Sequence, residues 1–319
     1  MRTYIVKRLL LFVPVLFLVS AIIFVILHVV PGDVVDRILA GPEGEGRYTQ
    51  AEYDQLRTRL GLDRPLYAQY LSWVGDVLRL DLGSSLVSNE PIRDALISRL
   101  PLTLELTVVT LGISLLIAIP AGVLSAVRQD TFVDHLIRTL AISGLTLPTF
   151  WTGSLLIIAL VLFFAWTPPI GYTPPWDNPA TNMQQIIFPA IILGYYYGAS
   201  VTRMVRSTLL EVLRQDYIRT AWAKGLREQI VVFRHALRNA FLPVLTISAF
   251  QFGHLLGGTV IMETLFTLPG MGSLLIFSVL NRDYPVVQTM ILLIAFFFLL
   301  INLAVDVLYA WLDPRIRYV

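Results

Sequence analysis

Six long runs of apolar residues follow one another along the chain, separated by polar stretches. Each run has the length that an α-helix needs to cross the hydrocarbon core of a bilayer, about 20 residues. The third run is longer than one crossing needs, which predicts a tilted helix or a start in the interface. The pattern therefore predicts an all-α, polytopic membrane protein with six transmembrane helices. The runs are Leu9–Val30, Leu102–Val127, Leu136–Trp166, Ile186–Met204, Phe241–Met262 and Val286–Leu312.

Composition agrees with a bilayer environment, since 56% of the 319 residues are hydrophobic and only 14% are charged. The chain has no cysteine, which excludes disulfides, thiolate metal sites and thiol catalysis. A net charge of +2 is too small to indicate nucleic-acid binding. The first apolar run lacks a small-residue cleavage site, so we expect a retained transmembrane helix and not a removed signal peptide.

Basic residues are concentrated in alternate connections between the apolar runs. They precede the first run, occupy 128–134 and 203–238, and recur in the C-terminal tail, whereas 167–185 has none and 263–285 has only Arg282. Lysine and arginine are enriched in cytoplasmic loops. We therefore expect both termini and the 203–238 loop in the cytoplasm.

This topology predicts four parts. Residues 1–30 form the cytoplasmic N-terminus and first transmembrane helix, and residues 31–100 form an extracytoplasmic helical segment. Residues 101–312 form a five-helix core that contains the cytoplasmic loop 203–238, and residues 313–319 form a cytoplasmic tail.

The segment 31–100 carries its own helix signals. A T-x-x-E capping box at 49–52 opens a helix that Gly61 ends, and an amphipathic pattern predicts a second helix at about 66–80. A third helix follows Pro91, and a separate transmembrane helix begins at Pro101. We expect a small helical cap that contributes to the surface for a delivery protein.

The loop 203–238 has eight basic residues against three acidic ones. Asp216 can cap a short helix from Tyr217 to Lys224, and Gly225 can end it in the left-handed conformation. A two-turn, solvent-facing helix is marginal by itself in water. We therefore expect a partner outside the chain to dock on it.

The fifth apolar run contains a polar cluster of Ser248, Gln251 and His254 beside Gly253 and Gly257. Small residues four apart allow close helix packing, whereas polar side chains in a span can line a solute pathway. Both interpretations stay open, and the two can coexist on opposite sides of the helix.

An acidic residue and a turn follow the fifth run: Glu263 precedes Pro269 and Gly270 within ETLFTLPGMGS. A Pro-Gly pair is typical of a tight turn. The segment is either an interfacial loop or, as the family resemblance described below implies, a gate at the mouth of a pathway.

No G-x-x-x-x-G-K-[ST] phosphate loop occurs in the sequence, and no two histidines have the spacing of a zinc enzyme. We therefore expect no catalytic residue, no metal site and no cofactor bound by this chain. Energy for active transport then has to come from another subunit.

Several stretches together resemble the inner-membrane permease subunits of ATP-binding-cassette importers, in the oligopeptide, dipeptide and nickel branch. The most specific are IRTAWAKG, beginning at Ile218, and RHALRNAFLPV, beginning at Arg234. The others are PGD near Pro31, ETLFTLPGMG near Glu263, LNRDYPVVQ near Leu280 and LDPRIRY near the C-terminus. The resemblance runs from the first helix to the last residues.

This resemblance implies an ATPase-coupling loop in which Gly225 is the signature glycine, and a closing pair Leu242 and Pro243. Arg219-Thr220-Ala221 stands where most importers have Glu-Ala-Ala, and 16 residues separate Gly225 from Leu242. Both departures are similar to the peptide branch, and Arg219 puts in doubt any salt bridge inferred from the general glutamate. The residues of the loop are Asp216, Tyr217, Ile218, Arg219, Thr220, Ala221, Trp222, Ala223, Lys224, Gly225 and Leu226.

The resemblance also implies partners: a second, homologous permease, two cytoplasmic ATPases that use ATP and Mg, and an extracytoplasmic solute-binding protein. It places the chain in the cytoplasmic membrane of a bacterium or archaeon, without a nucleic-acid partner. The implied function is half of a transmembrane pathway, foremost for dipeptides or oligopeptides, with nickel complexes, opines or oligosaccharides as alternatives.

Two other classes remain as alternatives at this point. An ion-driven secondary transporter would show acidic residues in the middle of a span, and only Glu105 and Asp306 come near that position. An intramembrane enzyme would need a nucleophile and base at bilayer depth, and the deep polar residues offer no such pair.

Overall fold

The computed structural model describes residues 2–29, 32, 34–41 and 46–312. The predicted tail 313–319 and the predicted junction at residues 30 and 31 lie outside them. In the described residues, regular structure consists of helices and one isolated bridge between Ser84 and Pro91, which confirms the all-α fold. The helices are α1 Arg2–Val29, α2 Val34–Ala40, α3 Gln50–Arg59, α4 Leu66–Leu78, α5 Ile92–Val127, α6 Phe132–Thr146, α7 Thr149–Phe164, α8 Pro179–Leu213, α9 Asp216–Ala223, α10 Glu228–Ile230, the π-helix η1 Val231–Ala236, α11 Leu237–Gly258, α12 Val260–Leu265, α13 Met271–Leu280 and α14 Tyr284–Leu312.

The chain divides into two compact units. Unit 1 comprises Met1–Pro101 with Gly270–Leu300, and unit 2 comprises Leu102–Pro269 with Ile301–Val319. The helices α5 and α14 each contribute to both units. The predicted domains are defined by their side of the membrane, so this division by contacts does not test them.

Four helices in the described chain are long and apolar enough to cross a membrane. They correspond to the first, second, fifth and sixth predicted spans, and a bent pair of helices corresponds to the third. The fourth predicted run lies within α8, which extends nine residues past Met204 to Leu213 and is not among these apolar helices. The count of six spans stays a prediction. The spans are Ile5–Val29, Ile92–Val127, Glu228–Gly257 and Tyr284–Leu308.

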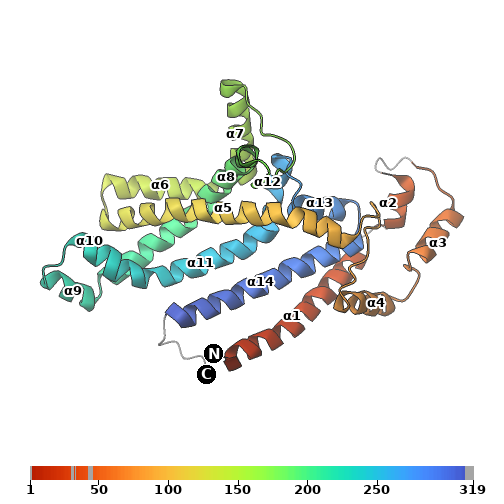
Figure 1. Cartoon of the computed structure of the whole chain (residues 1–319), viewed down its shortest axis with the longest axis horizontal. Helices are drawn as coiled ribbons and strands as arrows, with labels where there is room; N and C mark the ends of the chain where they lie inside the picture. The colour runs from red at the N-terminus through yellow and green to blue at the C-terminus, as the bar shows by residue number, and fades with distance from the viewer. Residues whose placement is uncertain (1, 30–31, 33, 42–45, 313–319) are drawn as a thin grey trace. The chain divides into compact units, whose positions relative to one another are not determined.

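The third run is broken where a tilted helix was expected. Helices α6 and α7 meet at an angle of 100°, which Figure 1 shows as a sharp corner. Leu147 between them is extended, with ψ 124°, and Pro148 follows. Proline disfavours the helical conformation of the residue before it, so the helix ends there.

The helix signals of residues 31–100 are largely confirmed. The amide of Glu52 donates to Thr49 Oγ1 (3.3 Å) and the amide of Thr49 donates to Glu52 Oε2 (2.7 Å), completing the capping box. Thr49 Oγ1 also donates to Glu52 Oε2 (2.9 Å), and the bonds from the Thr49 backbone and side chain lower the pKa of Glu52. Gly61 is left-handed, with φ +68°.

The predicted separation of a third helix from the second transmembrane helix is wrong. Helix α5 runs without interruption through Pro101, over 36 residues. Proline removes only one N–H from a helix, and Leu96 and Leu102 on either side are both buried. Packing therefore keeps the helix continuous through the proline.

Unit 2 contains a buried ion pair between two neighbouring helices. Arg206 of α8 donates to both carboxylate oxygens of Asp134 in α6, through Nε (2.8 Å) and Nη2 (2.7 Å). Ser125 Oγ (2.5 Å) and the amide of Asp130 (3.0 Å) also donate to this carboxylate. Asp134 is fully buried, and four donors satisfy its charge. Arg206 was counted with the cytoplasmic loop, but it instead holds α8 against α6.

We expect Arg206→Gln to lower the free energy of unfolding by about 3–5 kcal/mol, because it leaves the Asp134 carboxylate buried without its cation. The double variant that also carries Asp134→Asn should lose less free energy of unfolding than Arg206→Gln alone, because it no longer has a buried, uncompensated carboxylate. Denaturant unfolding in detergent micelles measures both. The matched control is Arg219→Gln, whose ion pair with Asp216 is exposed and worth about 0.2–1 kcal/mol. An effect of Arg206→Gln as small as the control's would contradict the assignment.

Candidate functional site

The predicted short helix exists as α9, but it begins one residue earlier than expected. Gln215 precedes it in an extended conformation, and the carbonyl of Gln215 accepts from the amides of Ile218 (3.0 Å) and Arg219 (3.2 Å). The prediction that Asp216 caps the helix is therefore wrong. Asp216 lies in the first turn, where a negative charge favours the positive end of the helix dipole.

The end of α9 has the predicted geometry. Gly225 has φ +74°, its amide donates to the carbonyl of Trp222 (2.9 Å), and the amide of Leu226 donates to that of Ala221 (3.4 Å). These two bonds form a Schellman motif, which requires a left-handed residue that glycine adopts without strain. The motif turns the chain sharply towards α10.

Packing within the chain anchors α9, so an external partner is not needed to hold it. Ile218 is fully buried and Ala221 nearly so, and both join an apolar cluster with residues of α5, α8, η1 and α11. Full burial of one isoleucine contributes about 1.5–3 kcal/mol. The buried members on the facing helices are Ala118, Val123, Ala126, Val201, Val205, Leu209, Val231, Val232, Ala236, Ala240 and Val244.

The opposite face of α9 is open and carries two aromatic side chains. Tyr217 is 45% exposed and Trp222 is 43% exposed, and Arg219, Thr220, Ala223 and Lys224 are exposed around them. Asn239 Nδ2 of α11 donates to Tyr217 Oη (2.7 Å), which fixes the tyrosine ring. Figure 1 shows α9 and α10 together at one end of α8 and α11. The helix thus presents a rigid aromatic and basic surface.

A π-helix joins α9 and α10 to the long helix α11. It spans Val231–Ala236, and the amide of Leu237 donates to the carbonyl of Val232. Such π segments are uncommon and recur at functional sites. Leu242 and Pro243, the predicted closing pair, lie inside α11, where Leu242 is half-buried and Pro243 is exposed. The π-helix and Pro243 place two irregular points between α9 and the polar cluster of α11.

The polar cluster of α11 faces α8, and its members play different parts. Gln251 Nε2 donates to the carbonyl of Tyr197 (3.0 Å) and to Ser200 Oγ (2.8 Å), so Gln251 ties the two helices together. Ser248 Oγ donates back to the carbonyl of Val244 (2.7 Å) in its own helix. Both side chains are buried and serve packing.

His254 combines packing with exposure to a cavity. Its Nδ1 lies 2.9 Å from Tyr197 Oη, and the ring also lines a pocket of about 390 Å³ at the break between α6 and α7. The other walls include Pro148 from the break and Tyr196 from α8. The contacts with α8 support the packing interpretation, and the interpretation as a pathway lining stays a prediction for His254.

A second pocket lies further along the same three helices, α6, α8 and α11. It measures about 530 Å³ and is lined by Arg138, Arg203 and Ser207, with Arg206 at its wall. Within the described residues, the guanidinium groups of Arg138 and Arg203 have no hydrogen-bonded or ionic partner. Both pockets are lined by residues of α6, α8 and α11, one by His254 and Tyr197 and the other by arginines, and the two are together called the groove below. The sequence analysis missed Tyr196, Tyr197, Arg138 and Ser207 because they lie on different helices.

Glu263 is fully buried in α12, between two threonines. Thr103 Oγ1 of α5 donates to Glu263 Oε1 (2.9 Å), and Thr259 Oγ1 donates to the same oxygen (2.7 Å). The residue therefore connects α12 to α5. Pro269 is exposed and Gly270 is buried, and the boundary between the two units falls between them.

Glu105 of α5 is bound to the connection before α8. Tyr172 Oη (2.7 Å) and Asn182 Nδ2 (3.1 Å) both donate to Glu105 Oε2. Burial, followed by the hydrogen bond to Glu105, raises the pKa of Tyr172. Glu105 thus holds the 165–178 connection against α5.

Comparisons with known proteins agree with this arrangement. Residues 118–318 match the family described as the binding-protein-dependent transport system inner membrane component, and residues 1–107 match the N-terminal family of the same membrane components. The chain belongs to this family. It is a permease subunit of an ATP-binding-cassette importer, embedded in the membrane.

Curated relatives match over their whole length. The chain is 42% identical to the glutathione transport system permease protein GsiC of Escherichia coli O6:H1, covering 100% of both chains. It is equally similar, at 42% over 100% of both chains, to GsiC of Shigella dysenteriae serotype 1. A solved structure of the MetNI methionine ABC transporter in an inward-facing conformation shares the fold, with a TM-score of 0.57 and 18% identity over 70% of this chain and 99% of that chain.

The family assignment settles the class of function. Permease subunits of these importers have no catalytic site and bind no cofactor, and ATP and Mg belong to the partner ATPases. In general they work with an ATPase, a binding protein and a second permease. The assignment removes the secondary transporter and the intramembrane enzyme from the alternatives.

We expect Ile218→Ala to release α9 from unit 2. Truncation of a buried isoleucine costs about 2–5 kcal/mol, and most contacts that hold this short helix are lost with it. Amide hydrogen exchange should accelerate throughout α9 and much less in α8. Trp222→Ala, on the open face, is the control and should leave exchange in α9 close to that of the native chain. Unchanged protection of α9 in Ile218→Ala would show that another interaction anchors the helix.

Proposed function

We propose that this permease forms half of the transmembrane pathway of an importer for short peptides, and that α9 receives mechanical work from a cytoplasmic ATPase. The observation that carries the proposal is the exposed aromatic and basic face of a helix whose other face is fixed in the core of unit 2. A partner that moves this face also moves the ends of α8 and α11. A free, flexible loop could not transmit such a displacement.

The proposed assembly contains two ATPases, one homologous second permease and one extracytoplasmic binding protein. The basic 203–238 segment supports a cytoplasmic position for α9, with both termini on the same side. Relatives from Escherichia and Shigella support the inner membrane of a bacterium. Residues 31–100 then face the binding protein.

Two observations support a peptide substrate. The relatives with 42% identity are named for transport of glutathione, a short peptide with free carboxylates. The groove along α6, α8 and α11 ends at Arg138 and Arg203, whose guanidinium groups are suited to carboxylates. Oligosaccharides lack such a group, and nickel complexes and opines remain the weaker alternatives. The groove is our candidate for the solute pathway.

The coupling needs a difference in affinity and not only a contact. An ATPase can shift the permease between two conformations only by as much as its binding to α9 differs between them. The break at Pro148, the π-helix and Pro243 are positions at which the helices around the groove can bend. Tyr197, bonded to His254, lines the same pocket as Pro148.

We expect Trp222→Ala to weaken the complex with the ATPases about thirtyfold or more, because exposed tryptophans at interfaces commonly contribute about 2 kcal/mol. The permease should still insert and fold, since Trp222 lies on the open face of α9. Affinity of purified subunits and ATP hydrolysis stimulated by loaded binding protein measure the effect. Trp176→Ala, which changes an exposed tryptophan in the 165–178 connection, is the control. Normal stimulation in Trp222→Ala would refute the coupling role of this surface.

The absence of native cysteine makes the proposed orientation testable by single-cysteine labelling. Ala223→Cys on α9 should react with a membrane-impermeant maleimide only after the membrane is opened. Tyr67→Cys on α4, where the tyrosine is 71% exposed, should react in intact cells. Labelling of Ala223→Cys in intact cells would overturn the cytoplasmic assignment of α9.

A further inference from the structure

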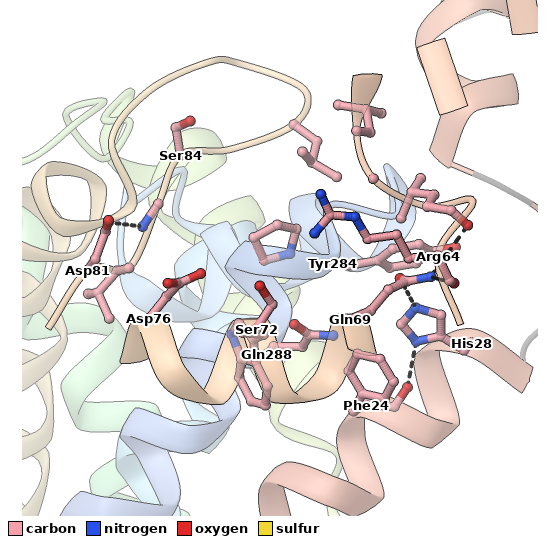
Figure 2. A pocket seen from close by; sticks show the side chains of 18 residues that line it. Phe24, His28, Arg64, Gln69, Ser72, Asp76, Asp81, Ser84, Tyr284 and Gln288 are labelled. Carbon is pink, nitrogen blue, oxygen red and sulfur yellow. Dashed lines mark hydrogen bonds between the residues drawn. The ribbon is translucent and has the colours of Figure 1, made fainter. Parts of the chain in front are cut away.

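Unit 1 contains a polar pocket that the proposed pathway does not use. Its volume is about 310 Å³, within the range of small-molecule sites. It is lined by the end of α1, by α4, by the connection between α4 and α5, and by the start of α14 (Figure 2). All of these segments belong to unit 1.

Hydrogen bonds and ring contacts fix one wall of the pocket. Tyr70 Oη of α4 lies 2.9 Å from Ser20 Oγ of α1, and the Tyr70 ring packs edge-on against Phe24 with centroids 5.3 Å apart. Gln69 Nε2 donates to the carbonyl of Arg64 (2.8 Å), while its Oε1 faces His28 Nε2 at 3.3 Å. Helix α4 and the turn before it are therefore held against α1.

The opposite rim is fixed by a buried aspartate. Ser85 Oγ donates to Asp283 Oδ2 (2.5 Å), and the amide of Leu86 donates to Asp283 Oδ1 (3.1 Å). Asp283 is almost completely buried and directly precedes α14. It joins the connection after α4 to the start of α14, so the pocket is a formed cavity and not a gap beside a loose loop.

Two carboxylates are brought to the same end of the pocket by the turn that ends α4. Leu80 is left-handed, with φ +62°, and this allows the amide of Asp81 to donate to the carbonyl of Asp76 (2.9 Å). Asp81 Oδ1 accepts from the amide of Gly83 (3.0 Å). Among the described residues, the carboxylate of Asp76 has no hydrogen-bonded or ionic partner.

Two further polar groups of the pocket, on Gln288 and Arg64, also lack partners among the described residues. Gln288 is only 4% exposed, and its side-chain amide is directed into the pocket without a hydrogen bond to any described residue. Because its polar atoms open onto the pocket, this amide is available to a ligand. Arg64, too, has no acceptor for its guanidinium group in the described chain. Figure 2 shows Asp76 and Asp81 at one end, Arg64 towards the other, and Gln288 between them.

We infer that this pocket binds a small zwitterionic molecule of the peptide type. Carboxylates alone would favour a cation, and a guanidinium group alone would favour an anion. Carboxylates at one end of the pocket and a guanidinium group towards the other favour a molecule that carries both charges. Asp76 and Asp81 receive its ammonium group, Arg64 its carboxylate and Gln288 an amide between them. Trp73 and Tyr284 supply apolar walls. The inference concerns unit 1 alone and does not depend on the coupling role of α9.

Trialanine and its two blocked forms test the inference directly. Calorimetry is performed on the complete importer in nanodiscs, without nucleotide or binding protein. Trialanine should bind. N-acetyl-trialanine lacks the ammonium charge and trialanine amide lacks the carboxylate charge, so each should bind at least about tenfold more weakly, which corresponds to a loss of about 1.4 kcal/mol in binding free energy. Absence of trialanine binding at millimolar concentration, or equal binding of all three, would overturn the inference.

Variants locate the binding within the molecule. Arg64→Gln should weaken trialanine binding and remove the preference for trialanine over trialanine amide. Asp76→Asn should remove the preference for trialanine over N-acetyl-trialanine. Arg59→Gln and Asp63→Asn change exposed charges outside the pocket and should change neither. If the pocket variants behave like these controls, the site lies elsewhere. If they alter only the affinity for the binding protein, the surface docks a protein and the inference fails.

Discussion

The packing of Ile218 and Ala221 against α5, α8, η1 and α11 is the interaction on which the proposed coupling depends. A helix of eight residues cannot persist by its own hydrogen bonds, so its geometry is set by the cluster beneath it. The same burial that stabilises α9 makes it move with the long helices. The open face is then available for a partner at little conformational cost, because Tyr217 and the end at Gly225 are already fixed.

Three buried carboxylates, distributed over both units, are each satisfied by hydrogen bonds or an ion pair. Asp134 is paired with Arg206, Glu263 is bonded to two threonines, and Asp283 is bonded to Ser85 and Leu86. In a medium of low dielectric constant, an unsatisfied charge costs more than a good hydrogen bond returns. Each of these acids therefore joins segments distant in the sequence, and each acts as a structural connection. The amide of Gln288 differs from them, since it faces the pocket of unit 1 without a partner among the described residues.

The sequence was most informative where local chemistry decides the structure. The capping box at Thr49 and the left-handed end at Gly225 depend on residues a few positions apart, and both are present. The start of α9 was misplaced because an aspartate is a good cap in general, whereas here the extended backbone of Gln215 takes that place. The 100° corner at Pro148 could have been inferred from the proline, but no charged residue interrupts the run there to mark the end of a helix.

Tertiary contacts explain what sequence reasoning could not supply. Arg206 and Asp134 are 72 residues apart, and Ser85 and Asp283 are 198 apart, so no spacing rule connects them. The same holds for the groove, whose polar residues come from three helices and show no common period. His254 was identified because it lies deep in the fifth apolar run, but its partner Tyr197 became visible only when α8 and α11 were placed side by side.

The chemistry of the groove bears on how a solute could be released. The pocket at the α6–α7 break has aromatic, hydroxyl and imidazole groups but no ionised carboxylate or guanidinium group among its lining residues. A pathway has to bind its solute weakly enough for the solute to leave, and weak polar contacts satisfy that requirement. Arg138 and Arg203 add attraction for a carboxylate at the other end of the groove. Both arginines are exposed, and an exposed charge binds a carboxylate less strongly than a charge from which water is excluded. In the proposed pathway, this favours passage of the solute over its capture.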